Sequence, residues 1–261
     1  MLLSIGMVLS MQLLEQFSKL AELGITYYTS DVHLFYGHGG SGKTHFAVYF
    51  PILMLYKELY DASMIGSNTR FIVIAHDDSY SIKRMRELAT ANGIDYNKLR
   101  EHITIFKPYD ILQLLETVNN IGKLVKQHNY DVKFIAVDGI NNAYVREMLT
   151  IQDQQAFIRY ARENVGIIKA VIDRLKLYAT KFDCIVTVTA HKKKTRRDQI
   201  PKKWYEEVYA GGVMQYAPSL VVRLEKVVTG SNKVKVKVVK ARHTGEGGEI
   251  VVEFTEQGFK V

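Results

Sequence analysis

The sequence contains little cysteine and little proline. Its single cysteine, Cys184, cannot form an internal disulfide, and the apolar run Cys184-Ile185-Val186 predicts a buried thiol rather than a nucleophile. A reducing, intracellular compartment fits this cysteine content best. Only four prolines are present, and neither an internal repeat nor a low-complexity linker divides the chain. We therefore expect one domain over residues 31–261.

Long hydrophobic runs are absent as well. The apolar start, Met1–Leu14, has no basic region in front of it. Serine, glycine and glutamine interrupt it well short of the ~20 residues that cross a bilayer. No targeting motif is visible. We expect residues 1–30 to form a helical segment that packs on or bridges cores, in a cytoplasmic protein with no membrane partner.

The overall composition is that of an ordinary globular protein, and positive charge is concentrated in one segment. The chain is 47% hydrophobic and 24% charged, which suits a packed domain of 261 residues. Its formal net charge is +8, and seven Lys or Arg against one Asp lie between His191 and Lys203. This segment predicts a local contact with a polyanion, although a solvated lysine-rich loop would have the same composition.

Short apolar runs alternate with longer helical patterns along most of the chain. The runs are typical of buried strands, and the stretches between them have apolar residues at helical spacing. The expected strands are 32–36, 71–75, 103–106, 134–137 and 184–189, and the expected helices are 44–60, 81–92, 110–127 and 154–181. This alternation predicts an α/β fold with a mostly parallel central sheet and helices on both faces.

The pattern changes to strands alone after Pro218. Runs at 220–227, 234–240 and 249–254 are expected as strands. In the second run, valines at 234, 236 and 238 alternate with lysines at 233, 235 and 237, as in a strand with one face in water. The sequence therefore predicts a C-terminal antiparallel extension of the sheet.

One motif has a specific chemical meaning. The residues Gly37, His38, Gly39, Gly40, Ser41, Gly42, Lys43 and Thr44 match the G-x-x-x-x-G-K-[ST] pattern of a P loop, after an expected strand and before an expected helix. Glycines let backbone N–H groups surround phosphates at a helix N-terminus, where the helix dipole favours negative charge. Lys43 is expected to reach the β and γ phosphates, so we expect ATP as the ligand.

Thr44 and Asp138 are the expected ligands of Mg²⁺. The last P-loop residue normally places its hydroxyl on the metal, and a strand-terminal aspartate supplies a carboxylate. Asp138 ends the run 134–137, and a strand next to the P-loop strand would bring it to the metal. Its alternative role is the N-cap of a following helix.

Three further side chains are expected at the same edge of the sheet. Asp77 and Asp78 follow the strand 71–75, and one of them is the candidate general base for the attacking water. Alternatively, they cap the helix that starts near Ser81. His191 ends the run from Cys184 and is expected to sense the γ-phosphate or polarise the water, with a purely structural histidine as the alternative.

This ordered series of motifs resembles the RecA/RadA superfamily, most closely the short archaeal RadB and KaiC-like proteins that consist of the ATPase core alone. The resemblance implies a RecA-type P-loop NTPase fold and covers nearly the whole chain. The similar segments are Phe17–Gly24, His33–Thr44, Phe71–Met85, Phe106–Asp110, Gly211–Leu224 and Thr255–Val261.

The resemblance also implies roles at the nucleotide. The family's catalytic glutamate falls on Asp77, which is one methylene shorter, so Asp78 could share the work. The segment Val239–His243 resembles the K-x-R element with which ring-shaped relatives contact the ATP of a neighbouring subunit. Lys240 and Arg242 would then act in trans by stabilising charge on the γ-phosphate, unless they are ordinary basic residues of a strand surface.

The loop between the last core strand and Gly211 corresponds to the family's single-stranded DNA loop. Cations can follow the phosphates while aromatic rings offer a stacking surface that tolerates any sequence. Trp204 could instead anchor the loop on the body. The candidate DNA contacts are Lys192, Lys193, Lys194, Arg196, Arg197, Lys202, Lys203, Trp204, Tyr205 and Tyr209.

The leading hypothesis is an oligomeric RecA/RadB-like ATPase that uses ATP and Mg²⁺ on single-stranded DNA in recombination or repair, with hydrolysis stimulated by DNA. A recombinase or another protein is a candidate partner. One alternative is a replicative or plasmid-type ring helicase, favoured by His191 and the pair Lys240 and Arg242. The other is a KaiC-like regulatory ATPase that binds a protein partner and no DNA.

Overall fold

A computed structural model describes residues 18–76, 80–193, 203–243 and 247–260. Its strands are β1 (Val32–Gly37), β2 (Thr69–Ala75), β3 (Ile103–Phe106), β4 (Asp131–Asp138), β5 (Ile185–His191), β6 (Leu220–Lys226), β7 (Lys233–Ala241), β8 (Glu249–Thr255) and β9 (Gly258–Lys260). Its helices are η1 (His45–Tyr49), α2 (Phe50–Asp61), α3 (Ile82–Ala91), α4 (Tyr96–Glu101), α5 (Ile111–His128), α6 (Asn142–Met148), α7 (Gln154–Phe182), η2 (Trp204–Glu206) and α8 (Gly211–Met214).

All the named strands belong to one sheet in the order β3-β2-β4-β5-β1-β6-β7-β8-β9. The strands from β3 to β6 in this order pair in parallel, and β7, β8 and β9 extend the sheet by antiparallel pairing. This confirms the predicted RecA-type α/β architecture with a C-terminal antiparallel extension. One expectation is wrong: β4, which ends at Asp138, does not neighbour the P-loop strand β1, because β5 lies between them.

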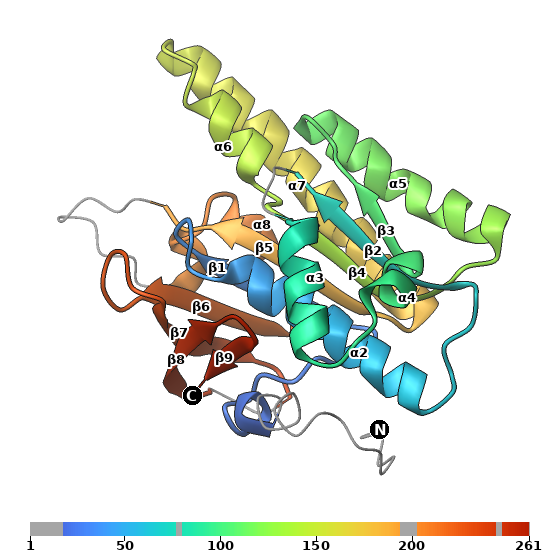
Figure 1. Ribbon diagram of the computed structural model, residues 1–261. Helices are drawn as coiled ribbons and strands as arrows, with labels where there is room; N and C mark the ends of the chain where they lie inside the picture. The colour runs from blue at the N-terminus through green and yellow to red at the C-terminus, as the bar shows by residue number, and fades with distance from the viewer. Residues whose placement is uncertain (1–17, 77–79, 194–202, 244–246, 261) are drawn as a thin grey trace.

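Helices cover both faces of the sheet (Figure 1). Apolar side chains of η1, α2, α3 and α4 pack on one face, and those of α5, α6, α7 and α8 pack on the other. Leu20 and Ile25, which precede β1, are buried with Val236 and Val238 of β7 on the first face. No helix in the described part of the chain is long and apolar enough to cross a membrane.

The longer helices begin and end at residues suited to capping. Side-chain oxygens of Ser81, Asp110 and Asp153 accept backbone N–H groups at the starts of α3, α5 and α7. Asn129 after α5 and Asp183 after α7 have left-handed backbone conformations that end those helices. These local signals explain why the predicted bounds of the three helices agree closely with the structure.

The helix after the P loop contains a π-helical stretch, η1, that the sequence pattern does not predict. Pro51 has no N–H group, so it cannot donate to the carbonyl of Ala47 four residues earlier. Instead, Phe50 N–H bonds to His45 O, and Thr187 Oγ1 of β5 donates to Ala47 O at 2.5 Å. The hydroxyl from β5 therefore satisfies the carbonyl that the proline leaves open, and ties the P-loop helix to the sheet.

Several short elements were not predicted from the sequence. They are α4, α6, α8 and η2, of which the longest has seven residues. Short helices carry too few turns for a periodic pattern to stand out. In α8, Gly211 is required by a contact with another segment, because a Cβ at this position would lie 2.0 Å from Tyr205 O.

The C-terminal extension has one buried and one wet face, as its alternating sequence predicts. Val234, Val236 and Val238 are buried in the core. On the opposite face, Lys235 and Lys237 of β7 form ion pairs with Glu249 of β8 at 3.1 and 3.9 Å.

The single cysteine, Cys184, is buried. Burial raises the pKa of its thiol to about 12, which agrees with its predicted inert role.

Candidate nucleotide site

Predicted site residues from three separated segments of the sequence line one cavity of about 500 Å³. Lys43 and Thr44 come from the P loop, Asp138 from the end of β4, and His191 from the end of β5. Their strands are parallel, so their carboxyl ends meet at the same edge of the sheet. The structure therefore brings these four predicted site residues to one place.

The backbone of the P loop is shaped by glycine. Gly42 has a φ of +82°, and a Cβ at this position would lie 2.2 Å from Cζ of Phe254. Only glycine fits both the left-handed conformation and the close approach of the ring. Ser41 Oγ in the same loop is buried and has no hydrogen-bond partner among the described residues. The Ser41 hydroxyl therefore lies in a loop whose glycine backbone can approach a phosphate closely.

Lys43 is folded against its own loop. Its ammonium donates to His38 O at 2.8 Å, and the residue is 9% exposed. This contact holds a cation within the glycine-rich turn, at the start of the helix that follows β1. An anion at this position would meet the lysine charge and the positive end of the helix together.

Thr44 and Asp138 are in direct contact. Thr44 Oγ1 donates to Asp138 Oδ2 at 2.8 Å, and Thr189 Oγ1 of β5 donates to Asp138 Oδ1 at 2.6 Å. Asp138 is 2% exposed and does not cap α6, which begins after Asn141. A hydroxyl and a carboxylate at hydrogen-bond distance form the hard oxygen pair that Mg²⁺ prefers. These residues fit a magnesium–nucleotide complex.

His191 is held at the cavity by Asn141, a residue that the sequence analysis missed. Asn141 Oδ1 accepts the backbone N–H of His191 at 2.9 Å, and its amide donates to His191 O and to Tyr209 O at 3.4 Å each. Asn141 is completely buried. Its place three residues after Asp138 is the only signal that the sequence offered.

The two candidate bases, Asp77 and Asp78, lie outside the described residues. Their neighbour His76 is described, and its backbone N–H donates to Asp138 O at 3.1 Å. At the start of α3, the side chain of Ser81 accepts the Arg84 N–H as the N-cap. The residue before Asp77 is therefore bonded to the backbone of Asp138, at the end of β4.

Arg84, Phe254 and His45 complete the cavity wall and were not predicted. Arg84 of α3 donates to the carbonyls of Thr255 at 2.7 Å and Glu256 at 3.2 Å. His45 packs edge-on against Phe254 with ring centroids 4.9 Å apart, and burial lowers the pKa of His45 to about 3. The C-terminal extension is thereby fastened to the P-loop helix, a contact across more than 200 residues of sequence that no local pattern reveals.

Lys240 and Arg242 lie away from this cavity. Lys240 Nζ donates to Gln215 O at 3.0 Å, and Arg242 donates to Tyr216 O at 3.3 Å. Neither residue lines the nucleotide cavity of its own chain. Both cations are instead held beside the carbonyls of the segment that follows α8.

The candidate DNA residues divide by their surroundings. Lys194, Arg196, Arg197 and Lys202 lie outside the described residues, and Lys203 is exposed. Lys192 is nearly buried and pairs with Glu225 at 2.5 Å, while burial lowers the pKa of Lys193.

The aromatic candidates rest partly on the body of the protein. Trp204 is half-buried, and its ring centroid lies 6.3 Å from that of Tyr36 in β1. Tyr205 packs edge-on against Trp204, at 5.9 Å between centroids. Tyr209 is half-buried against the same core. Trp204 therefore makes the anchoring contact that was the alternative to a stacking role.

Comparison with known proteins identifies relatives that are similar over most of this chain. No family model matches the sequence. The chain is 25% identical to the DNA repair and recombination protein RadB of Methanococcoides burtonii over 242 residues, which covers 92% of this chain and 95% of that protein. It is 24% identical to RadB of Thermococcus sibiricus over 86% of this chain and 84% of the relative, and 21% identical to RadB of Methanobrevibacter smithii over 85% and 84%. Along most of its length, the chain is similar to RadB proteins.

Proposed function

We propose that this protein is an oligomeric ATPase that acts on single-stranded DNA in recombination or repair. The observation that carries the proposal is the cavity at which Lys43, Thr44, Asp138 and His191 come together at the carboxyl edge of a RecA-type sheet. Similarity to RadB proteins, whose name states DNA repair and recombination, supports the choice among ATPases.

The P loop and the end of β4 would together bind ATP and its Mg²⁺. Lys43 and the backbone N–H groups of residues 37–44 would hold the phosphates. Thr44 and Asp138 would hold Mg²⁺, which, when bound, neutralises charge on the β and γ phosphates. Thr189 keeps the Asp138 carboxylate in the orientation in which Thr44 meets its other oxygen.

Asp77 or Asp78 would act as the general base for the attacking water. The proton of the water would pass to the carboxylate as its oxygen bonds to the γ-phosphorus. The bond from that phosphorus to the β,γ-bridging oxygen would break, and ADP and phosphate would leave. His191 would hydrogen-bond to the γ-phosphate or to that water from the end of β5. The buried Asn141 fixes the backbone of His191, so that its side chain stays at the cavity wall.

The cationic and aromatic loop after β5 would bind single-stranded DNA. Lys203 is exposed at the described end of this loop and lies beside Tyr205, with its ammonium 5.7 Å from the ring centroid. Together with Lys194, Arg196, Arg197 and Lys202, it would contact phosphates, and Tyr205 would offer a ring to a base.

The oligomer would complete the nucleotide site. Lys240 and Arg242 do not line the cavity of their own chain, so contact with a nucleotide requires a second copy. Residues 31–261 would form the ATPase unit, and the segment 1–30 would bridge units. Leu20, which is buried against the β7 side of the sheet, supports packing of this segment on a core.

Steady-state ATP hydrolysis tests the proposal. The wild type and Lys43→Ala should be measured with and without oligo-dT, at two salt concentrations, with Lys57→Ala as a control for removing a lysine from the same helix. We expect Lys43→Ala to lower turnover on the order of 100-fold or more and Lys57→Ala to have little effect. Oligo-dT should stimulate the wild type, less so at high salt.

DNA binding should be measured in parallel by fluorescence anisotropy. Lys203→Ala should lower the salt dependence of oligo-dT binding by about 0.7 in log–log slope, the value for one phosphate contact on a single strand. Lys133→Ala, which removes a cation paired with Asp131 at the opposite end of the sheet, is the matched control. Hydrolysis without DNA binding would favour the regulatory alternative and overturn the DNA role.

A further inference from the structure

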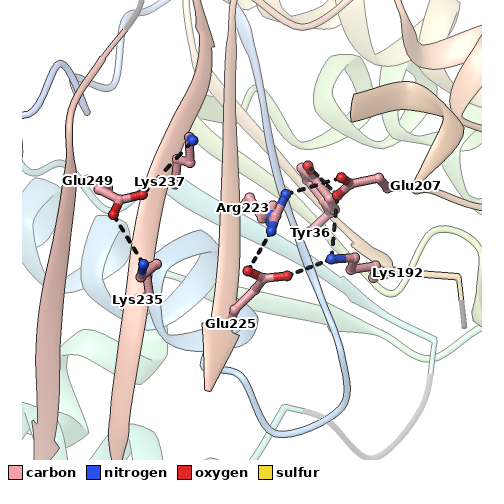
Figure 2. A network of polar contacts seen from close by, with 8 residues as sticks. All are labelled: Tyr36, Lys192, Glu207, Arg223, Glu225, Lys235, Lys237 and Glu249. Carbon is pink, nitrogen blue, oxygen red and sulfur yellow. Dashed lines mark hydrogen bonds and ion pairs between the residues drawn. The ribbon is translucent and has the colours of Figure 1, made fainter. Parts of the chain in front are cut away.

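A compact charged cluster lies between the P-loop strand and the candidate DNA loop (Figure 2). Glu207, which follows η2, accepts hydrogen bonds from Tyr36 Oη at 3.0 Å and from Arg223 at 3.1 Å. Arg223 also donates to Glu225 at 2.6 Å, and Lys192 pairs with Glu225 at 2.5 Å and with Glu207 at 3.6 Å. The cluster therefore joins β1, β6 and both ends of the loop after β5.

The cluster is electrically balanced and largely removed from water. It holds two carboxylates and two cations, and the side chains of Glu207 and Lys192 are each 12% exposed. Burial acts to raise the pKa of Glu225, but hydrogen bonds from Arg223 and Lys192 outweigh burial and hold that pKa at about 2. Burial and the neighbouring Glu207 raise the pKa of Tyr36, so its hydroxyl stays the donor. Glu225 therefore stays ionised and Tyr36 stays protonated across the physiological pH range.

Backbone hydrogen bonds turn the cluster into a closed ring. Gly37, the first residue of the P loop, accepts the N–H of Lys192 at 3.1 Å, and Glu207 O accepts the N–H of Lys193 at 2.7 Å. The side chain of Glu207 accepts the hydroxyl of Tyr36, the residue before Gly37, and this bond connects Glu207 to β1. Both described ends of the candidate DNA loop, at Lys193 and at Lys203 to Glu207, are thus connected to one strand end.

We infer that Glu207 is a positioning residue that couples the loop after β5 to the P loop through Tyr36 and Lys192. A displacement of the loop on binding a polyanion would move the carbonyl of Gly37 and the backbone that holds the nucleotide phosphates. Coupling between two sites is reciprocal, so nucleotide binding would alter the loop in the absence of DNA. The inference rests on the proposed function for its ligands, but this last consequence needs only a nucleotide.

The same face of the sheet offers a matched control. Lys235 and Lys237 pair with Glu249 on the outer strands, and these side chains are 44% to 49% exposed (Figure 2). Exposed pairs of this kind are screened by water and salt. They share the chemistry and the sheet face of the cluster, but within the described residues their ion pairs join only β7 and β8.

Hydrogen–deuterium exchange of the full-length protein tests the inference. Exchange of the amides in 203–210 is compared with and without a non-hydrolysable ATP analogue and Mg²⁺, in the wild type, Glu207→Gln, Tyr36→Phe and Glu249→Gln. We expect the nucleotide to change exchange in the wild type and in Glu249→Gln on the order of five-fold. In Glu207→Gln and Tyr36→Phe, the change should be lost. Thermal unfolding verifies that each variant is folded, and Tyr36→Phe, which removes one hydroxyl, is the variant least disturbed in packing.

Nucleotide affinity, measured with a fluorescent analogue, separates the possible results. The inference predicts that the affinities of Tyr36→Phe and the wild type differ by no more than the coupling, about five-fold. Nucleotide binding without any change of exchange in the wild type would overturn the inference and leave the proposed ATPase intact. An unchanged response in both cluster variants would also overturn it. A wild type that binds no nucleotide would overturn the proposed function together with the inference.

Discussion

Thr44 Oγ1 donates a hydrogen bond to Asp138 Oδ2 at 2.8 Å, although β5 separates the strands that precede these two residues. The contact is possible because the P-loop helix crosses the sheet and packs on both β5 and β4. Thr189 of β5 occupies the intervening position and donates to the other carboxylate oxygen. The strand between the two candidate metal ligands therefore supplies the residue that orients one of them.

Thr189→Val should weaken magnesium binding without removing a metal ligand. Valine keeps the shape of threonine but removes the hydrogen bond from Thr189 Oγ1 to Asp138 Oδ1. Loss of a partner that orients a ligand typically costs about 10–100-fold in metal affinity. We expect the Mg²⁺ concentration for half-maximal ATP turnover to rise by about that factor. Thr180→Val, at an exposed position on α7, should not change it, and an unaltered magnesium requirement in Thr189→Val would contradict the proposed role.

Thr187→Val should destabilise the fold. The substitution removes the only described side-chain donor to Ala47 O, the carbonyl that Pro51 cannot satisfy. A buried carbonyl without a partner costs about 1–3 kcal/mol, and Thr187 is completely buried. Urea unfolding should report a loss of this size in the free energy of unfolding. Ser219→Ala provides a comparison, because the one bond of its buried hydroxyl within the described residues is a long one, 3.4 Å to Val32 O. Equal losses in both variants would argue against a special role for Thr187.

His33 should make the stability fall in mild acid. Its Nε2 accepts the Tyr28 N–H at 3.2 Å and its Nδ1 lies 3.1 Å from Val186 O, so the folded protein holds a neutral ring. Burial lowers the pKa of His33 to about 4, against the opposing effects of the hydrogen bond with Val186 O and of Asp31, and with an addition from His243. The unfolded chain binds the proton first, so stability is complete above about pH 6.5 and is lost as the pH falls towards 4.

The size of this effect follows from the two pKa values. Between pH 7 and pH 4, His33 should account for a loss of about 3 kcal/mol in the free energy of unfolding. His33→Gln should remove this component from the pH dependence, as measured by urea unfolding at a series of pH values. His128→Gln, at an exposed position on α5, should retain the pH dependence of the wild type. A His33→Gln variant with the same pH dependence would disprove the assignment.

The sequence predicted those features whose cause lies within a few neighbouring residues. The P-loop glycines and the alternating valines of β7 each carry their own reason within a few residues. The order of strands does not, because the place of β5 between β4 and β1 depends on which helices pack on which face. Asn141, Arg84 and Phe254 were missed for the same reason. Their hydrogen bonds and ring contacts join segments between 50 and 209 residues apart, as in Asn141 with His191 and His45 with Phe254.

Mixing two inactive variants tests the proposed intersubunit site. Lys43→Ala would lack a working P loop, and Arg242→Ala would lack the proposed trans cation. Neither should hydrolyse ATP well alone. In a mixed oligomer, a P loop from an Arg242→Ala subunit can meet Arg242 from a Lys43→Ala neighbour, which restores a complete site. Random pairing of equal amounts should restore roughly one site in four.

The result separates a trans role from a cis role because the two make opposite predictions. If Arg242 acted within its own chain, no mixture could combine an intact Lys43 with an intact Arg242 at one cavity, and activity would stay at the level of the inactive variants. The pair Lys43→Ala and Asp138→Asn is the control, because Thr44 and Asp138 are bonded within one chain and mixing should restore nothing. Recovery in the first mixture, with none in the second, would place Arg242 at a neighbour's nucleotide. Equal recovery in both would point to exchange of whole segments between subunits rather than to a trans cation.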